Sequence, residues 1–260
     1  MLRRRLASAP LVAGLLVASC ALASASEPRA VLELFTSQGC SSCPPADKLL
    51  GDLAGDPSLV VISVPIDYWD YLGWKDTLAN PAHSARQRAY ARLRGDRQVY
   101  TPQIVVNGST HVLGSDRAAV EHAIAVTDRN AAVMSVPVLL SVAGDTLNVK
   151  VTAGKEHVSG EVWLCPLARS MPVEIGRGEN HGRTVTYHNV VRRWIKLGDF
   201  NGTDATWNLA ISEIMTDDID AAAVMVQQGT HDRPGVVLGA AFVPVRRQTT
   251  DVRVPTISDR

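Results

Sequence analysis

The feature that most constrains the fold is a pair of cysteines set between a strand-like and a helix-like segment. Cys40 and Cys43 stand two residues apart within the stretch FTSQGCSSCPPAD. The apolar run VLELF at Val31–Phe35 precedes them, and an amphipathic stretch at Ala46–Ala54 follows, with its leucines on one face. The spacing of the sulfurs alone allows a metal site, a structural disulfide or a redox pair. The surrounding pattern therefore has to distinguish these uses.

Strand and helix signals continue beyond the cysteines. LVVISV at Leu59–Val64 is apolar and β-branched, as in a strand buried on both faces. Asn-Gly at 107–108 predicts a hairpin, because both turn residues need a positive φ. The remaining expected elements are a helix at Pro81–Arg94 with Asn80 as its cap, strands at Gln103–Val106 and Thr110–Leu113, and a helix from its cap Ser115 to Val126. This β-α-β-α-β-β-α order, with a Cys-x-x-Cys pair beside a βαβ unit, predicts an α/β thioredoxin-like domain over residues 27–129.

The second half of the chain has a different pattern. Between Val136 and Val245 we count seven short β-like runs: VPVLLSV, TLNVKV, GEVWLC, TVTYHNVV, ATWNLAI, AAAVMVQ and GVVLGAAFV. Turn signals separate the early runs at hairpin distance. This pattern predicts an all-β, sandwich-like domain over residues 130–260.

The N-terminus predicts export. Three arginines at 3–5 and the apolar run LVAGLLVASCALASA form a signal peptide over residues 1–25, with cleavage after Ala25. VASC at 17–20 also resembles a lipoprotein cleavage box, so a membrane contact is expected only if Cys20 is lipidated. A periplasmic or secreted protein meets conditions in which thiols are oxidised. Lys plus Arg and Asp plus Glu number 26 each, so no net charge attracts the chain to nucleic acid.

Redox chemistry needs an attacking thiolate, a resolving sulfur and a place for the substrate. If Cys40 caps the helix that follows, unpaired N–H groups and the helix dipole stabilise its thiolate. Cys43, one turn further on, is then the resolving thiol. Tyr100-Thr101-Pro102 supplies the third element, since a proline directly before a strand belongs to a turn or a strand start. Thioredoxin-like folds hold a cis-proline there, opposite the cysteines, and the residue before it offers its backbone to an extended substrate.

Four blocks of sequence resemble one family of exported bacterial proteins with a thioredoxin-like domain and no assigned function. The blocks are LELFTSQGCSSCPPAD, VPIDYWDYLGWKD, YTPQIVVNG and RGENHGRTVTYHNVV. The resemblance implies a thioredoxin-like fold and a redox pair, with a disulfide in its oxidised form, at Cys40 and Cys43 opposite Pro102. It implies no particular reaction. The Ser-Ser between the cysteines differs from the Gly-Pro of thioredoxins and the Pro-His of strong oxidants, which leaves the direction of exchange open.

Several other residues have two interpretations each. Glu33, inside the first strand, is either a buried proton acceptor for the resolving thiol or an outward-pointing side chain. The aromatic segment 67–74 either walls a peptide groove or packs into the domain interface. The polar loop 177–183 either reaches over the redox site or only makes a turn. We expect Cys165 to be a buried free thiol, and His181 and His188 to be ordinary surface or packed residues rather than metal ligands.

These observations together predict a thiol–disulfide oxidoreductase that acts on a protein or small-thiol partner. Cys40 and Cys43 carry the exchange, and Tyr100, Thr101 and Pro102 shape the substrate groove. We expect no cofactor and no metal. Two alternatives remain open: a copper- or zinc-handling module that uses the same sulfurs, and a non-catalytic adaptor in which the disulfide is structural.

Overall fold

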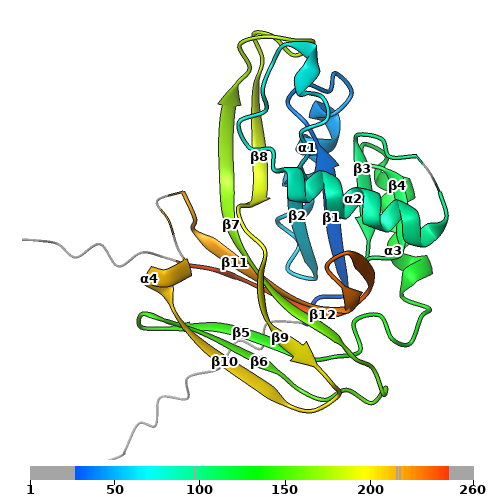
Figure 1. Ribbon diagram of the computed structural model, residues 1–260, viewed down its shortest axis with the longest axis vertical. Helices are drawn as coiled ribbons and strands as arrows, with labels where there is room; N and C mark the ends of the chain where they lie inside the picture. The colour runs from blue at the N-terminus through cyan, green and yellow to red at the C-terminus, as the bar shows by residue number, and fades with distance from the viewer. Residues whose placement is uncertain (1–26, 97, 215, 217, 246–260) are drawn as a thin grey trace, which may run out of the picture.

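The computed structural model describes residues 27–96, 98–214, 216 and 218–245 (Figure 1). The expected signal peptide, Cys20 and the closing residues 251–260 lie outside the described residues. Within the described part of the chain, no helix is both long and apolar enough to cross a bilayer.

The first half of the chain has the expected order of strands and helices. Its elements are β1 (Ala30–Thr36), α1 (Pro44–Leu53), β2 (Leu59–Pro65), the 3₁₀ turn η1 (Asp70–Leu72), α2 (Pro81–Arg94), β3 (Gln103–Val106), β4 (Thr110–Leu113) and α3 (Arg117–Thr127). Asn80 caps α2 as expected, since its side chain accepts a hydrogen bond from the Ala82 N–H at 2.9 Å. The expected cap of α3 is wrong by one residue. Asp116, not Ser115, accepts the Ala119 N–H at 3.0 Å, because its carboxylate is at the right distance from the third helical residue.

The second half is mainly β-structure. Its elements are β5 (Val138–Ala143), β6 (Thr146–Val151), β7 (Gly160–Glu174), β8 (Thr184–Val191), β9 (Ile195–Phe200), β10 (Ala205–Ala210), the short helix α4 (Ile211–Ile214), β11 (Ala221–Thr230) and β12 (Arg233–Pro244). The strand β9, IKLGDF, was not expected from the sequence, because a glycine and two charged residues interrupt its apolar pattern. It forms because it pairs with one end of the long strand β7.

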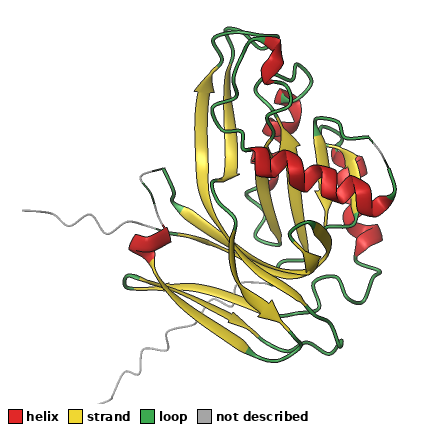
Figure 2. Ribbon diagram, viewed as in Figure 1, coloured by secondary structure: helices red, strands yellow, loops and turns green. Residues whose placement is uncertain are grey.

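A large sheet joins the two halves of the chain. Its order is β12-β11-β7-β8-β2-β1-β3-β4, with β9 attached to β7, and β10-β6-β5 form a second, three-stranded sheet. The junction is a parallel contact between β2 and β8, where Ser63 pairs with Val190. The molecule is thus a mixed α/β structure with a large and a small sheet (Figure 2). The proposed boundary between residues 129 and 130 stays a prediction.

Helices cover both faces of the part of the sheet that β1, β2 and β3 form. Leu32 and Leu34 of β1 pack with Leu50 of α1 on one face. Val31 and Phe35, on the other face, pack with Tyr90 of α2. The side chains of a strand alternate between its faces, so a strand buried on both faces reads as nearly continuous apolar sequence. This explains why β1 and β2 are nearly continuous apolar runs.

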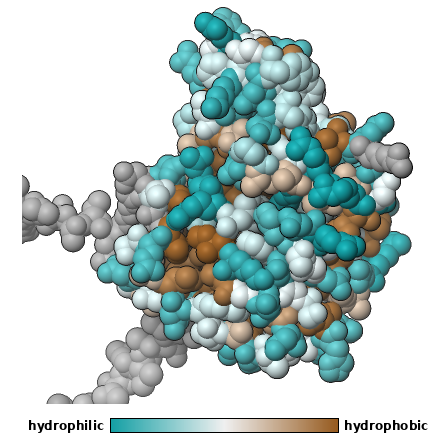
Figure 3. All heavy atoms as spheres, in the orientation of Figure 1, coloured by the Kyte–Doolittle hydropathy of each residue, from teal (hydrophilic) through white to brown (hydrophobic). Residues whose placement is uncertain are grey.

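The small sheet covers the other end of the large one. Leu147 and Val149 of β6 pack against Val162 of β7, Val224 of β11 and Leu238 of β12. Burying one such side chain stabilises the fold by about 1.5–3 kcal/mol. The outer surface shown in Figure 3 is mostly hydrophilic, with the hydrophobic residues gathered in a few patches.

Candidate functional site

The two cysteines lie on the turn that starts α1. The Cys43 N–H donates to the Cys40 carbonyl at 3.2 Å, and the Cys43 carbonyl accepts the N–H groups of Ala46 and Asp47 at 2.8 and 3.1 Å. Cys43 is therefore the N-cap residue, and the expectation that Cys40 caps the helix is wrong. A hydrogen-bonded turn intervenes and places Cys40 three residues before the cap. Pro44 follows without the loss of a hydrogen bond, because the N–H group of a residue in the first helical turn would have no partner in the helix.

Cys40 and Cys43 form a disulfide, with their Cα atoms 5.4 Å apart. Their residues are 3% and 0% exposed, so Cys40 is the less enclosed of the two. The Cys40 sulfur lies 3.5 Å from the hydroxyl oxygen of Ser42, and both Ser41 and Ser42 are exposed. A nucleophile from solvent therefore meets this serine pair before it meets either sulfur.

Pro102 lies against the start of α1. The Thr101–Pro102 peptide bond is cis, and β3 begins at the next residue. A Cβ added to Gly114 would lie 3.2 Å from both the Pro102 Cβ and the Ala46 Cβ, so the proline and the first turn of α1 touch the same glycine. No described residue forms a hydrogen bond with the main chain of Thr101. Tyr100 lies further off: its hydroxyl is 2.9 Å from Nδ1 of His111.

The aromatic segment 67–74 packs over this region and also borders it. The Trp69 indole N–H donates to the Thr101 hydroxyl at 2.7 Å, and the Trp69 Cβ lies 3.1 Å from a Cβ placed on Gly39. Tyr71 stacks on Trp69 with ring centroids 6.2 Å apart and is 76% exposed. Trp69 therefore packs in the fold, as one interpretation expected, whereas Tyr71 is exposed. The interpretation of the segment as the wall of a peptide groove stays a prediction.

The loop between β7 and β8 reaches the cysteine turn. The side-chain amide of Asn180 donates to the main-chain oxygens of Gln38 and Cys40, at 2.9 and 2.8 Å, and Asn180 is buried. In Figure 1 the tip of the β7–β8 hairpin lies beside the segment that contains η1. Gly176 contacts Trp74 of that segment, whose indole N–H donates to the Gln38 side chain at 2.8 Å. Of the two interpretations of this loop, reaching over the site is correct.

Glu33 points inward, toward α2. Its carboxylate accepts two hydrogen bonds from the Arg86 guanidinium, at 2.6 and 3.0 Å, and another from the Tyr90 hydroxyl. The Arg86 guanidinium also donates to the Gln227 side chain of β11 at 2.8 Å. The outward-pointing interpretation of Glu33 is therefore wrong. Its role as a proton acceptor stays a prediction.

Asp47, which the sequence reasoning did not single out, is a second buried carboxyl group. It lies in the first turn of α1 and is 2% exposed. Burial raises the pKa of Asp47 well above its usual range, the nearby Thr36 hydroxyl lowers it by less, and the charge of Asp76 raises it further. The only sequence signal was an acidic residue at a position that the helical pattern places on the apolar face of α1.

Cys165 is a buried free thiol, as expected, and the two histidines differ in exposure. Cys165 is a fully buried free thiol in β7, and burial raises its pKa. His181 is exposed, and His188 is partly buried against Gly51. Among the described residues, no group of three or more His, Cys, Asp or Glu side chains is placed to hold a metal ion.

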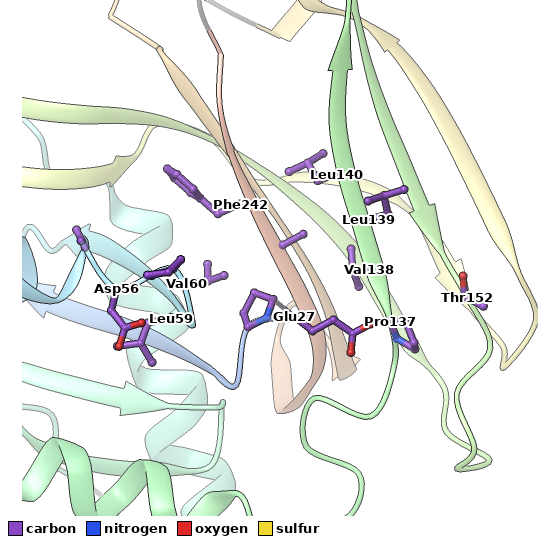
Figure 4. Close-up of a pocket in the computed structure, with 15 residues that line it drawn as sticks. Glu27, Asp56, Leu59, Val60, Pro137, Val138, Leu139, Leu140, Thr152 and Phe242 are labelled. Carbon is purple, nitrogen blue, oxygen red and sulfur yellow. The ribbon is translucent and has the colours of Figure 1, made fainter. Parts of the chain in front are cut away.

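A pocket of about 520 Å³ lies apart from this site, between β5, β12 and the loop after α1 (Figure 4). Its lining is mainly apolar and includes Leu139, Leu140 and Phe242. None of the cysteine-site residues lines it.

Comparison with known proteins identifies a family but no activity. The family model described as protein of unknown function (DUF1223) matches residues 31–227. The structure resembles an X-ray crystal structure of a protein from Agrobacterium tumefaciens, with 31% sequence identity, a TM-score of 0.76, and coverage of 86% of this chain and 96% of that one. No curated protein matches significantly. Because the family model matches well over half of this chain, the chain belongs to the DUF1223 family of proteins of unknown function.

Proposed function

We propose that the protein is an exported thiol–disulfide oxidoreductase whose reactive pair is Cys40 and Cys43. The observation that carries the proposal is the Cys40–Cys43 disulfide on the turn that starts α1, with Pro102 and the first turn of α1 in contact with the same glycine, Gly114. Disulfide exchange needs a thiolate, and the N-terminus of a helix stabilises one. Cys43 is the N-cap residue of α1, and Cys40 lies on the turn directly before it. The predicted signal peptide supports an oxidising compartment, in which such a pair has partners.

The proposal includes the finer reading of the fold. We assign residues 27–129 to a thioredoxin-like domain and residues 130–260 to a β-sandwich-like domain. The helix and strand order of the first half supports the first assignment. The apolar layer between the two sheets supports the second.

Exchange proceeds in two steps. The Cys40 thiolate of the reduced protein attacks one sulfur of a substrate disulfide, forms a mixed disulfide and releases the other substrate sulfur as a thiolate. Cys43 then attacks the Cys40 sulfur, reforms the Cys40–Cys43 disulfide and releases the second substrate thiolate. Two electrons pass from the protein to the substrate, and the reverse sequence oxidises a dithiol substrate.

The substrate binds along the main chain of Thr101 and the residues beside it. The Thr101 main chain has no partner within the described chain, so an extended peptide or a small thiol compound such as glutathione can bind to it. Tyr71 offers an exposed aromatic surface, and it stacks on Trp69, the residue that donates to the Thr101 hydroxyl. Aromatic side chains supply large contact area at low entropic cost.

The test is to replace Cys40 with serine and measure reduction of insulin disulfides by dithiothreitol. We expect Cys40→Ser to fall to the uncatalysed rate, while the matched control Cys165→Ala keeps the wild-type rate, because Cys165 is buried away from any substrate. Equal turnover by Cys40→Ser and the wild type would refute the proposal.

One observation favours the adaptor alternative: both cysteines are almost completely buried. The reduction potential of the pair separates the two functions. A working dithiol falls between about −120 and −270 mV, whereas a structural disulfide lies below about −300 mV. Nothing in the arrangement of the described side chains favours the copper- or zinc-handling alternative.

A further inference from the structure

Asp47 is a buried carboxyl group without a hydrogen-bond partner. Neither of its oxygens forms a hydrogen bond within the described part of the chain, and the nearby Thr36 hydroxyl lies outside hydrogen-bonding geometry. An unpaired carboxyl in this position costs stability, since almost all buried polar groups in proteins are paired. The Asp47 carboxyl lowers stability and lies one turn from the Cys40–Cys43 disulfide. Together these observations indicate a functional role for it.

The helix directs Asp47 toward Cys43. The Asp47 N–H donates to the Cys43 carbonyl at 3.1 Å, and the backbone of Cys43 is already in the right-handed helical region. Residues four apart on a helix are neighbours, with Cβ atoms about 5–6 Å apart. Because helical side chains tilt toward the N-terminus, helix geometry predicts that the side chain of Asp47 leans toward the turn that contains Cys43. Both residues are buried, so no bulk water competes for the proton between them.

Of the groups that face Asp47, only the Thr36 hydroxyl favours a negative charge there, and its effect on the pKa is smaller than that of burial. Asp76 adds a second carboxyl from the segment before α2, and Tyr187 of β8 is a buried phenol. Burial raises the pKa of Asp76 as well, in spite of its hydrogen bond from the Gln38 N–H. Thr36 of β1 is neutral. Burial and the charge of Asp76 therefore raise the pKa of Asp47 well above its usual range.

We propose that Asp47 is the proton donor to the Cys43 sulfur when the Cys40–Cys43 disulfide is opened, and the acceptor when it reforms. The inference rests on the proposed function. Glu33 fits this role less well, because Arg86 and Tyr90 already occupy its oxygens on the α2 side of the sheet.

The step balances as follows. An external thiolate attacks the Cys40 sulfur, a bond forms between them, and the Cys40–Cys43 bond breaks with its electron pair left on Cys43. Cys43 is fully buried, so a free thiolate there would be costly. The Asp47 proton moves to the Cys43 sulfur and gives a neutral thiol, and the carboxylate regains a proton from water. In the reverse direction, Asp47 as carboxylate takes the proton from Cys43 as this thiol attacks the mixed disulfide.

The experiment measures how fast dithiothreitol opens the disulfide in the full chain between about pH 5 and 10, with each rate divided by the concentration of dithiothreitol thiolate. We expect Asp47→Asn to be slower by roughly 100-fold at neutral pH, a typical loss for a general acid or base. Asp52→Asn is the matched control, because Asp52 lies on the same helix but is solvent-exposed and paired with Lys48. We expect it to keep the wild-type rate.

The pH profile separates proton transfer from a merely structural effect. In the wild type the thiolate-corrected rate should fall as pH rises and Asp47 loses its proton, and in Asp47→Asn it should be flat. Asp47→Asn should also fold. Because the pKa of Asp47 is raised on folding, its carboxyl makes the folded protein less stable as pH rises above about 3.8. Asp47→Asn should therefore have a free energy of unfolding at neutral pH that equals or exceeds that of the wild type.

The outcomes distinguish the two proposals. A wild-type profile that is flat, or an Asp47→Asn rate equal to the wild-type rate, overturns the role of Asp47 and leaves the redox function standing. If dithiothreitol cannot open the wild-type disulfide at all, both proposals fail.

Discussion

At the scale of single residues, two buried carboxyl groups illustrate two ways of holding a charge inside the protein. Glu33 is paired with Arg86 and Tyr90, so its negative charge is balanced by a neighbouring cation. Asp47 has no such partner. Removing one partner of a buried ion pair costs about 3–5 kcal/mol, which makes the Glu33 pair a structural link between β1 and α2. The proton transfer that we propose for Asp47 rests on this difference.

His83 sets a pH dependence of stability. It is buried, its Nδ1 lies 2.8 Å from the Pro65 carbonyl oxygen, and its Nε2 has no partner among the described residues. Burial lowers the pKa of His83 from 6.5 to about 4. Below pH 6.5 the unfolded chain therefore binds a proton that the folded chain does not, so the free energy of unfolding should fall between about pH 6.5 and 4, by about 3 kcal/mol in total.

Urea denaturation across this pH range tests the effect. The free energy of unfolding should depend less on pH in His83→Gln than in the wild type. In the control His122→Gln the dependence should stay unchanged, since His122 is exposed on α3. An unchanged pH dependence in His83→Gln would show that other groups cause it.

At the scale of elements, the turn between β3 and β4 does more than reverse the chain. Asn107 and Gly108 have φ values of 50° and 67°, as the hairpin signal predicted. The Asn107 side chain also accepts the Val31 N–H at 2.7 Å and donates to the Thr127 hydroxyl at 2.9 Å, so it links the turn to β1 and α3. A Cβ on Gly108 would lie 2.2 Å from the Gly235 carbonyl oxygen. The turn is therefore packed tightly against the first residues of β12.

Two glycine substitutions separate strain from packing. Gly144, in the β5–β6 turn, has a φ of 59° and nothing within 4 Å of an added Cβ. Gly144→Ala should cost only the left-handed strain, about 1–2 kcal/mol. Gly108→Ala should cost this strain plus about 1–3 kcal/mol for displaced main chain. Chemical denaturation measures both, and equal losses would contradict the close contact at Gly108.

At the scale of the whole molecule, one apolar core contains residues from both halves of the chain. Val31 and Tyr90 from the first half pack in the same cluster as Leu167 and Met225 from the second. Asn180 adds a polar contact across the same division, at the cysteine turn. The second half therefore helps to shape the candidate site.

Expression of residues 27–129 alone tests how far the first half is independent. Without β7, β8 and β11, this fragment would leave the edge of β2 unpaired and would lose part of the apolar core that both halves share. We expect it to lack a cooperative unfolding transition by circular dichroism, unlike the full chain. A sharp transition would instead support an autonomous thioredoxin-like domain.

What the sequence determined by itself is the local structure of the first half, including the turn that carries Cys40 and Cys43 before α1. The bounds of α2, β3 and β4 follow from a cap, a proline and an Asn-Gly turn, all of which act within a few residues. The tertiary structure alone decided which distant groups meet at the cysteines: Asn180 at the Cys40 carbonyl, Trp69 at Thr101, and Asp76 near Asp47. It also decided that β8 joins β2 in one sheet. The physical reason is that caps, turns and periodicity are short-range, whereas strand pairing and burial depend on chain segments that only the folded molecule brings together.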